Sequence, residues 1–152
     1  MNKINYVFPK EVPEKCSKYF FVEIDGKMIQ SENDWLYTMA EKFHFPVSSG
    51  QQNIYWFKGA FEYPRKHFMN WNRFQDWITD LEWLNTDSII LVIYNYKYFM
   101  ENLPEAKTYI INDLENTIDF WENAEKYIVD GQRKDFSIFI TEGDLYGKVQ
   151  TY

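Results

Sequence analysis

The sequence has only one cysteine and two histidines among its 152 residues. A single cysteine, Cys16, excludes an internal disulfide framework and a zinc site built on several cysteines. His44 and His67 leave little material for a histidine-rich metal centre. We therefore expect no metal site.

Long apolar runs are also missing. The longest, 89–94, is far shorter than the roughly 20 residues that cross a bilayer, and the first nine residues lack the apolar core of a signal peptide. No repeat and no Gly/Ser/Pro-rich linker divides the chain. We expect a cytoplasmic protein with one domain over residues 1–152.

Catalytic motifs are absent as well. The sequence contains no Walker motif, GxGxxG, HExxH or EF-hand pattern. A thiol protease would need Cys16 together with His44 or His67. Cys16, however, lies in a lead-in flanked by proline and lysine, without the Gly-rich or helix-N-terminal setting that activates a catalytic thiol. The expectation is that the protein is not an enzyme.

Acidic residues outnumber basic ones, 23 to 16, which gives a net charge of −7. Nucleic acid is therefore not expected as a partner, because phosphate binding needs clustered Lys and Arg. The negative net charge suits a basic protein partner. Aromatic residues make up 20% of the chain, which argues against long disorder.

Strand and helix patterns alternate along the chain. Strands are expected where aromatic and β-branched residues gather, at 18–24, 88–94 and 135–140. Helices are expected from the Ser31 cap to Pro46, over 70–84, briefly at 98–103, and from Pro104 to a glycine cap at Gly131. This order predicts an α/β fold, a small three-stranded parallel sheet with helices packed on it. Residues 1–17 form a lead-in, 141–152 form a tail, and 47–66 could add an edge strand or hairpin.

Residues 70–84 form the clearest amphipathic helix. Its apolar side carries Trp71, Phe74, Trp77, Ile78, Leu81 and Leu84. Its polar side carries Asn72, Gln75, Asp76, Thr79 and Asp80. Trp71 and Trp77 are expected in the core, like Trp35 and Trp121 on the other helices. Trp83 lies toward the polar arc, so a core position and an exposed anchor both stay open.

The same residues carry a resemblance to a known family. The stretch Asn70-Trp71-x-x-Phe74-x-Asp76-x-Ile78-x-Asp80-Leu81-x-Trp83-Leu84 is similar to the NWDAxxDxLxDLxWL signature on the inhibitor helix of the barstar family, the inhibitors of barnase-type ribonucleases. With its flanking elements, the resemblance covers residues 18–140. It implies a three-stranded parallel sheet, no catalytic activity, no cofactor and a protein target. In that family the inhibitor helix and the loop before it plug a ribonuclease active site.

The sequence departs from the family pattern at several places. The loop before the signature reads His67-Phe68-Met69-Asn70, without the usual glycine. Asn72 replaces the first aspartate of the signature, whereas Asp76 keeps the second. About twenty extra residues, 47–66, precede the loop, and the tail 141–152 extends beyond the usual end of the family.

Asp76 is the first choice for the central contact with a ribonuclease or another nuclease toxin. The residues expected around it are Asn72, Gln75, Asp80, Phe68 and His67. Asp76 and Asp80, one helical turn apart, could mimic substrate phosphates and pair with basic active-site residues. They could equally belong to an ordinary solvated helix face.

A second interface is possible in the aromatic segment 54–63. Tyr55 and Trp56, together with neighbouring aromatics, could be exposed anchors or could pack down as a flap over the sheet. If they are exposed, the alternative function is a non-inhibitory interaction module on a barstar-like fold, which uses 54–63 to bind a different partner.

Overall fold

The computed structural model describes residues 4–45, 69–124 and 133–144. The chain forms two compact units. The first combines Met1–Gln30 with Glu82–Tyr152, and the second is Ser31–Leu81. Each unit is described by itself.

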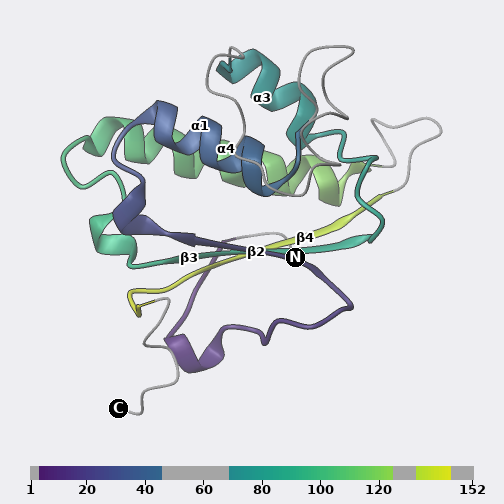
Figure 1. The fold of residues 1–152 in the computed structure, drawn as a ribbon, viewed down its shortest axis with the longest axis horizontal. Coiled ribbons are helices and arrows are strands. Elements are labelled where there is room, and N and C mark those ends of the chain that lie inside the picture. The colour runs from purple at the N-terminus through teal and green to yellow at the C-terminus, as the bar shows by residue number, and fades with distance from the viewer. Residues whose placement is uncertain (1–3, 46–68, 125–132, 145–152) are drawn as a thin grey trace. The chain divides into compact units, whose positions relative to one another are not determined.

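The first unit is built on a four-stranded, entirely parallel sheet in the order β1-β4-β3-β2 (Figure 1). Its strands are β1 (Ile4–Tyr6), β2 (Phe20–Asp25), β3 (Ser88–Tyr94) and β4 (Asp135–Ile140). The predicted α/β fold with a parallel sheet is confirmed, and β3 and β4 have the predicted bounds. The lead-in supplies a fourth strand, β1, at the sheet edge. The edge strand or hairpin expected from 47–66 lies outside the described residues.

Strand β3 is covered on both faces, as its continuous apolar run predicts. All residues from Ile89 to Tyr94 are buried. On one face Val12 of the lead-in packs in a cluster with Ile90, Val92 and Tyr94. Helix α4 (Pro104–Glu122) lies on the opposite side of the sheet from the lead-in (Figure 1).

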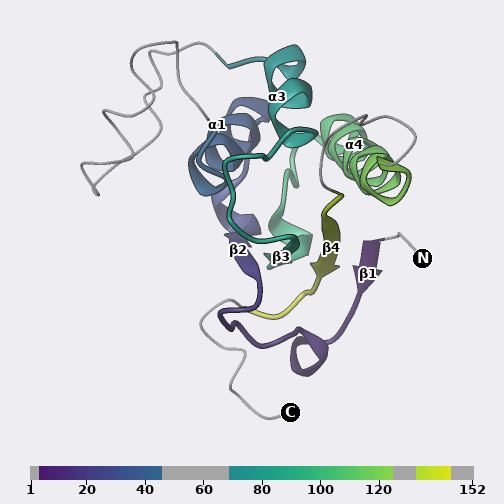
Figure 2. The same cartoon turned by 90° about the vertical axis from the view of Figure 1, so that its right-hand side faces the viewer.

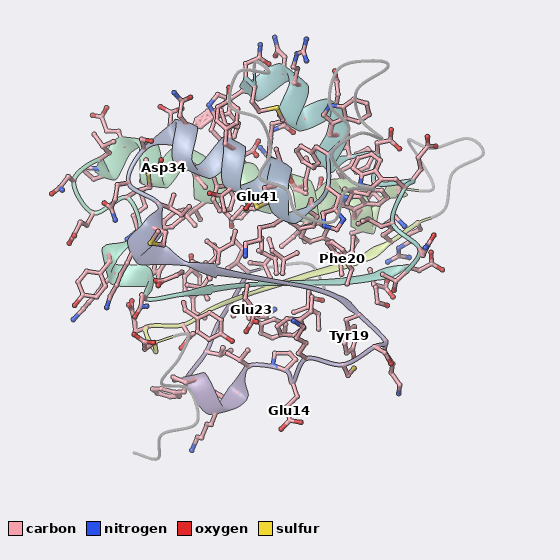
Figure 3. The ribbon with its side chains drawn as sticks, viewed as in Figure 1. Glu14, Tyr19, Phe20, Glu23, Asp34 and Glu41 are labelled. Carbon is pink, nitrogen blue, oxygen red and sulfur yellow. The ribbon has the colours of Figure 1, made fainter. Side chains whose placement is uncertain are left out.

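A polar contact lies within the face covered by the lead-in. The Tyr94 hydroxyl donates to Glu23 Oε2 at 3.2 Å. Burial, together with the Glu23 carboxylate, raises the pKa of Tyr94 well above its usual value. Tyr19 and Glu23 lie on this side of the sheet, whereas Glu14 on the lead-in points away from it (Figure 3). The lead-in therefore forms a layer of this unit.

Helix α4 follows the predicted helical spacing. Pro104 occupies its first turn, where a missing N–H costs nothing. Ile110, Leu114, Ile118 and Trp121 are buried at intervals of three or four residues. The predicted continuation to Ile128 and the cap at Gly131 lie outside the described residues. No helix in the described ranges is long and apolar enough to cross a membrane.

The second unit contains α1 (Glu32–Lys42) and α3 (Trp71–Ile78). The predicted cap of α1 is confirmed, because the Asp34 amide donates to Ser31 Oγ at 3.0 Å. The chain then leaves α1 through His44, whose φ of 57° lies in the left-handed region. Partial burial of His44 lowers the pKa of its imidazole below 6.5.

The depressed His44 pKa predicts a pH-dependent stability. The unfolded chain binds the His44 proton more readily than the folded chain, so the free energy of unfolding falls as the pH drops below about 6.5. The variant His44→Asn removes the titration, and asparagine tolerates the left-handed backbone. We expect a smaller loss of stability between pH 7.5 and 5.5 for His44→Asn than for the parent, measured by urea unfolding. An equal loss would contradict the assignment.

Candidate functional site

The candidate site is the polar face of α3. The opposite face holds the helix in its unit, because Phe74 and Ile78 are buried there. The Phe74 ring contacts Phe45, which follows α1, with a centroid separation of 5.8 Å. The apolar spacing in the sequence therefore orients this helix as predicted.

The start of α3 is held by α1 through two hydrogen bonds. The Trp71 indole Nε1–H donates to Glu32 Oε1 at 2.8 Å. The Met69 amide donates to the Tyr37 hydroxyl at 3.1 Å. These contacts join residues 39 and 32 positions apart in the chain. No local sequence pattern predicts either of them.

Asn70 caps α3. Its side-chain Oδ1 accepts a hydrogen bond from the Arg73 amide at 2.8 Å, and its backbone is extended. This bond satisfies one of the amides that an α-helix leaves without a partner in its first turn. The capping residue thus fixes the first turn, which carries Asn72 and Arg73.

Removing the Asn70 cap is expected to lower the stability of the protein measurably. Replacing a capping Asn by alanine typically costs about 1 kcal/mol. We expect Asn70→Ala to lower the free energy of unfolding by about that amount, whereas Asn70→Ser retains most of it because a hydroxyl also caps. Chemical denaturation of the two variants beside the parent measures both changes. If the alanine and serine variants are equally stable, the capping bond contributes nothing.

Three polar side chains of α3 are exposed: Asn72, Arg73 and Asp76. Gln75 is partly buried. Within the described part of the chain, no hydrogen bond or ion pair engages the Asp76 carboxylate. That carboxylate can therefore accept bonds from a partner without first breaking bonds to the described residues. Arg73, which the sequence reasoning passed over, adds a cation to the same exposed face.

The predicted end of this helix at residue 84 is wrong. The helix ends at Ile78, where the Thr79 hydroxyl donates to the Gln75 carbonyl at 2.6 Å. Leu81 then adopts a φ of 54° while its side chain is fully buried. Asp80 consequently lies in the turn after α3 and is partly buried. Asp76 is the only one of the two aspartates on the helix itself.

Two of the four tryptophans that the sequence predicts in the core are only partly buried. Trp35 and Trp121 are fully buried, as expected. Trp71 and Trp77 are only partly buried, and so is Trp83. Trp77 directly follows Asp76, so a large aromatic side chain accompanies the carboxylate at a partly accessible position. Tryptophan is enriched among the residues that dominate binding energy at interfaces.

Four predicted partner-binding residues cannot be placed, because His67, Phe68, Tyr55 and Trp56 lie outside the described residues. The structure bears on the expectation of no metal site only within the described ranges. There, no group of three or more His, Cys, Asp or Glu side chains could hold an ion. The placed part of the candidate site thus consists of α3 and the turn that follows it.

Comparison with protein families matches residues 52–141 to Barstar (barnase inhibitor). The match spans more than half of the 152-residue chain and includes α3, β3, α4 and β4. The chain therefore belongs to the barstar family, as the signature on α3 indicates. The match begins inside 47–66, the segment that looks like an insertion in the sequence. Comparison with curated proteins gives no significant match, and comparison with solved structures gives none either.

Proposed function

We propose that this protein is a stoichiometric inhibitor of a basic ribonuclease or related nuclease toxin, which it binds through the polar face of α3. Membership of a family described as barnase inhibitors supports the class of function. The observation that carries the proposal is the exposed Asp76 carboxylate, which has no partner among the described residues. It occupies the signature position where the family carries an aspartate.

The chemistry of such inhibition is that of a phosphate mimic. A ribonuclease active site uses cationic side chains to stabilise the charge of its substrate phosphate. A carboxylate presented on a fixed helix can occupy the same place and accept charge-assisted hydrogen bonds. Because the inhibitor carries no bond to be cleaved, the complex blocks the site without turnover. Trp77 and Gln75 would exclude water around the ion pair.

Charge also supports a basic target. The net charge of −7 creates a negative field that accelerates encounter with a positively charged protein. We expect the association rate with the cognate nuclease to fall at least about fivefold between 20 and 200 mM salt, since screening shortens the reach of that field. Stopped-flow mixing measures the rate. A rate that does not change with salt would contradict electrostatic steering.

Two earlier expectations stay predictions. The first is a single barstar-like domain over residues 1–152. The second is the alternative function, a non-inhibitory module that binds a different partner through 54–63. Those residues lie outside the described ranges, so no observation favours the alternative over α3.

A further inference from the structure

A second surface with the character of a binding site lies in the first unit, at the carboxyl ends of the strands. Open parallel sheets commonly bind their ligands at this edge. A hollow of about 290 Å³ opens there beside the ends of β1 and β4. It is lined by Tyr6, Val7, Phe8, Pro9, Glu11, Tyr96, Ile140, Thr141 and Glu142. Figure 2 shows β1 beside β4, with the turn of residues 9–11 following β1.

Two of the three aromatic residues that line this hollow are exposed, whereas Tyr96 is partly buried. Phe8 is 71% exposed and Tyr6 is 60% exposed. The Tyr6 ring stands edge-on to the Tyr96 ring, with centroids 5.9 Å apart. Rings that serve only the core are buried, whereas clustered exposed rings mark interaction surfaces.

The walls of the hollow are held by a backbone hydrogen bond and by a close contact of Gly143 with the Pro9 ring. The Val7 amide donates to the Ile140 carbonyl at 2.9 Å, which extends the pairing of β1 with β4. On the other side, Gly143 approaches Pro9 so closely that a Cβ atom on Gly143 would lie 2.2 Å from Pro9 Cγ. The aromatic rings are therefore presented on a fixed frame, which lowers the entropy that binding must overcome.

Both acidic side chains that line the hollow are held in place. Glu11 Oε1 accepts from the Phe8 amide at 2.9 Å, and Glu142 Oε1 accepts from the Lys97 amide at 2.7 Å. A carboxylate has about four acceptor sites, so each retains capacity for a further donor. Lys107 Nζ stands 4.1 Å from the centroid of the Tyr96 ring, and Glu142 favours the charged form of this lysine, so Glu11 is the acidic side chain better placed for an incoming cation. The lining itself thus combines exposed rings with two carboxylates.

The size, the charge and the aromatic lining of the hollow indicate which kind of ligand it binds. The hollow is small, about 290 Å³, and the rings of Tyr6 and Phe8 beside it are exposed, so it suits the side chains of an extended peptide. A second copy of this chain is disfavoured, because each copy carries a net charge of −7. Aromatic grooves bind proline-rich segments, whose extended conformation is already formed before binding. Arginine matches the lining, since its planar group stacks on rings and forms bonds to carboxylates.

We propose that this hollow binds an extended, proline-rich segment of a partner protein that carries arginine. The prolines pack on the exposed rings of Tyr6 and Phe8, and an arginine bonds to Glu11. The site uses no residue of α3, so the proposal goes beyond nuclease inhibition and does not rest on it.

The test measures binding of fluorescein-labelled peptides to the full chain by fluorescence anisotropy. The probe is Arg-Pro-Pro-Arg-Pro-Pro-Arg, and the matched control has glutamate at the three arginine positions. We expect the arginine probe to bind with a dissociation constant on the order of 100 μM, and the glutamate probe to bind at least about tenfold more weakly. Failure of the arginine probe to bind at 1 mM protein, or equal binding of both probes, would overturn the proposal.

Variants locate the binding. Phe8→Ser and Glu11→Gln should each weaken the arginine probe at least about fivefold. Phe8 is so exposed that its removal leaves the core intact, and glutamine retains an oxygen for the Phe8 amide. Leu103→Ser is the control, because Leu103 is also an exposed apolar side chain, at 45%, but does not line the hollow. Equal binding by Phe8→Ser and the parent would place the probe elsewhere and overturn the proposal.

Discussion

Asp76→Ala is expected to weaken binding of the cognate nuclease by roughly 30- to 4,000-fold. Truncating one partner of a desolvated, hydrogen-bonded charge pair typically costs about 2–5 kcal/mol, because the opposite charge remains buried without compensation. Asp76 is exposed and makes no bond with the described residues in the free protein. Its loss should therefore leave the fold intact and act mainly on the dissociation rate.

The matched control for this variant is Glu115→Ala. Glu115 is exposed on α4, and its replacement changes the net charge by the same amount. Surface plasmon resonance with the nuclease immobilised gives both rates for each variant. The proposal places the interface on α3, so a charge on α4 contributes only through the screened field, and Glu115→Ala should change affinity by less than about threefold. Equal affinities for Asp76→Ala and the parent would remove Asp76 from the interface.

Gly26→Ala is expected to cause the largest loss of stability among the substitutions considered, about 2–3 kcal/mol. Gly26 follows β2 and is buried against the end of β3. A Cβ atom at this position would lie 2.6 Å from the Asn95 carbonyl oxygen and 2.7 Å from the Tyr94 carbonyl oxygen. Both oxygens belong to the backbone at the end of β3, so the clash can be relieved only if the ends of β2 and β3 move apart.

Lys27→Ala is the control for Gly26→Ala, because Lys27 lies in the same turn and its side chain is half exposed. Its ion pair with Asp144, at 3.9 Å, is a surface pair worth less than about 1 kcal/mol. Urea unfolding of both variants measures the difference. A Gly26→Ala protein as stable as Lys27→Ala would show that the close approach of Gly26 to β3 is not required.

Local sequence patterns correctly predicted the features that depend on residues close together in the chain. The run 88–94 and the alternation 135–140 gave β3 and β4 their bounds, because apolar β-branched residues fill both strands. Ser31 capped α1 through its own hydroxyl. Asp76 could be placed on a polar helix face for the same reason, since Phe74 and Ile78 define the buried side.

Features that depend on distant partners could not be predicted. Strand β1 has only three residues and no recognisable pattern, and it forms because β4 offers an open edge. The Asn5 side chain reaches the Ile138 carbonyl, 133 residues away, at 3.1 Å. The early end of α3 depends on the left-handed backbone of Leu81, a residue type that normally avoids it. The contact of Trp71 with Glu32 likewise joins two helices.

The most direct test of the proposed inhibition is a capture and titration experiment. The full chain, immobilised, is exposed to extract of its source organism, and the protein bound in equal amounts is released and assayed for ribonuclease activity. We predict a small basic nuclease that is active alone and loses its activity linearly up to one equivalent of this chain. A bound partner that is acidic, or that keeps its full activity at one equivalent, would contradict the account.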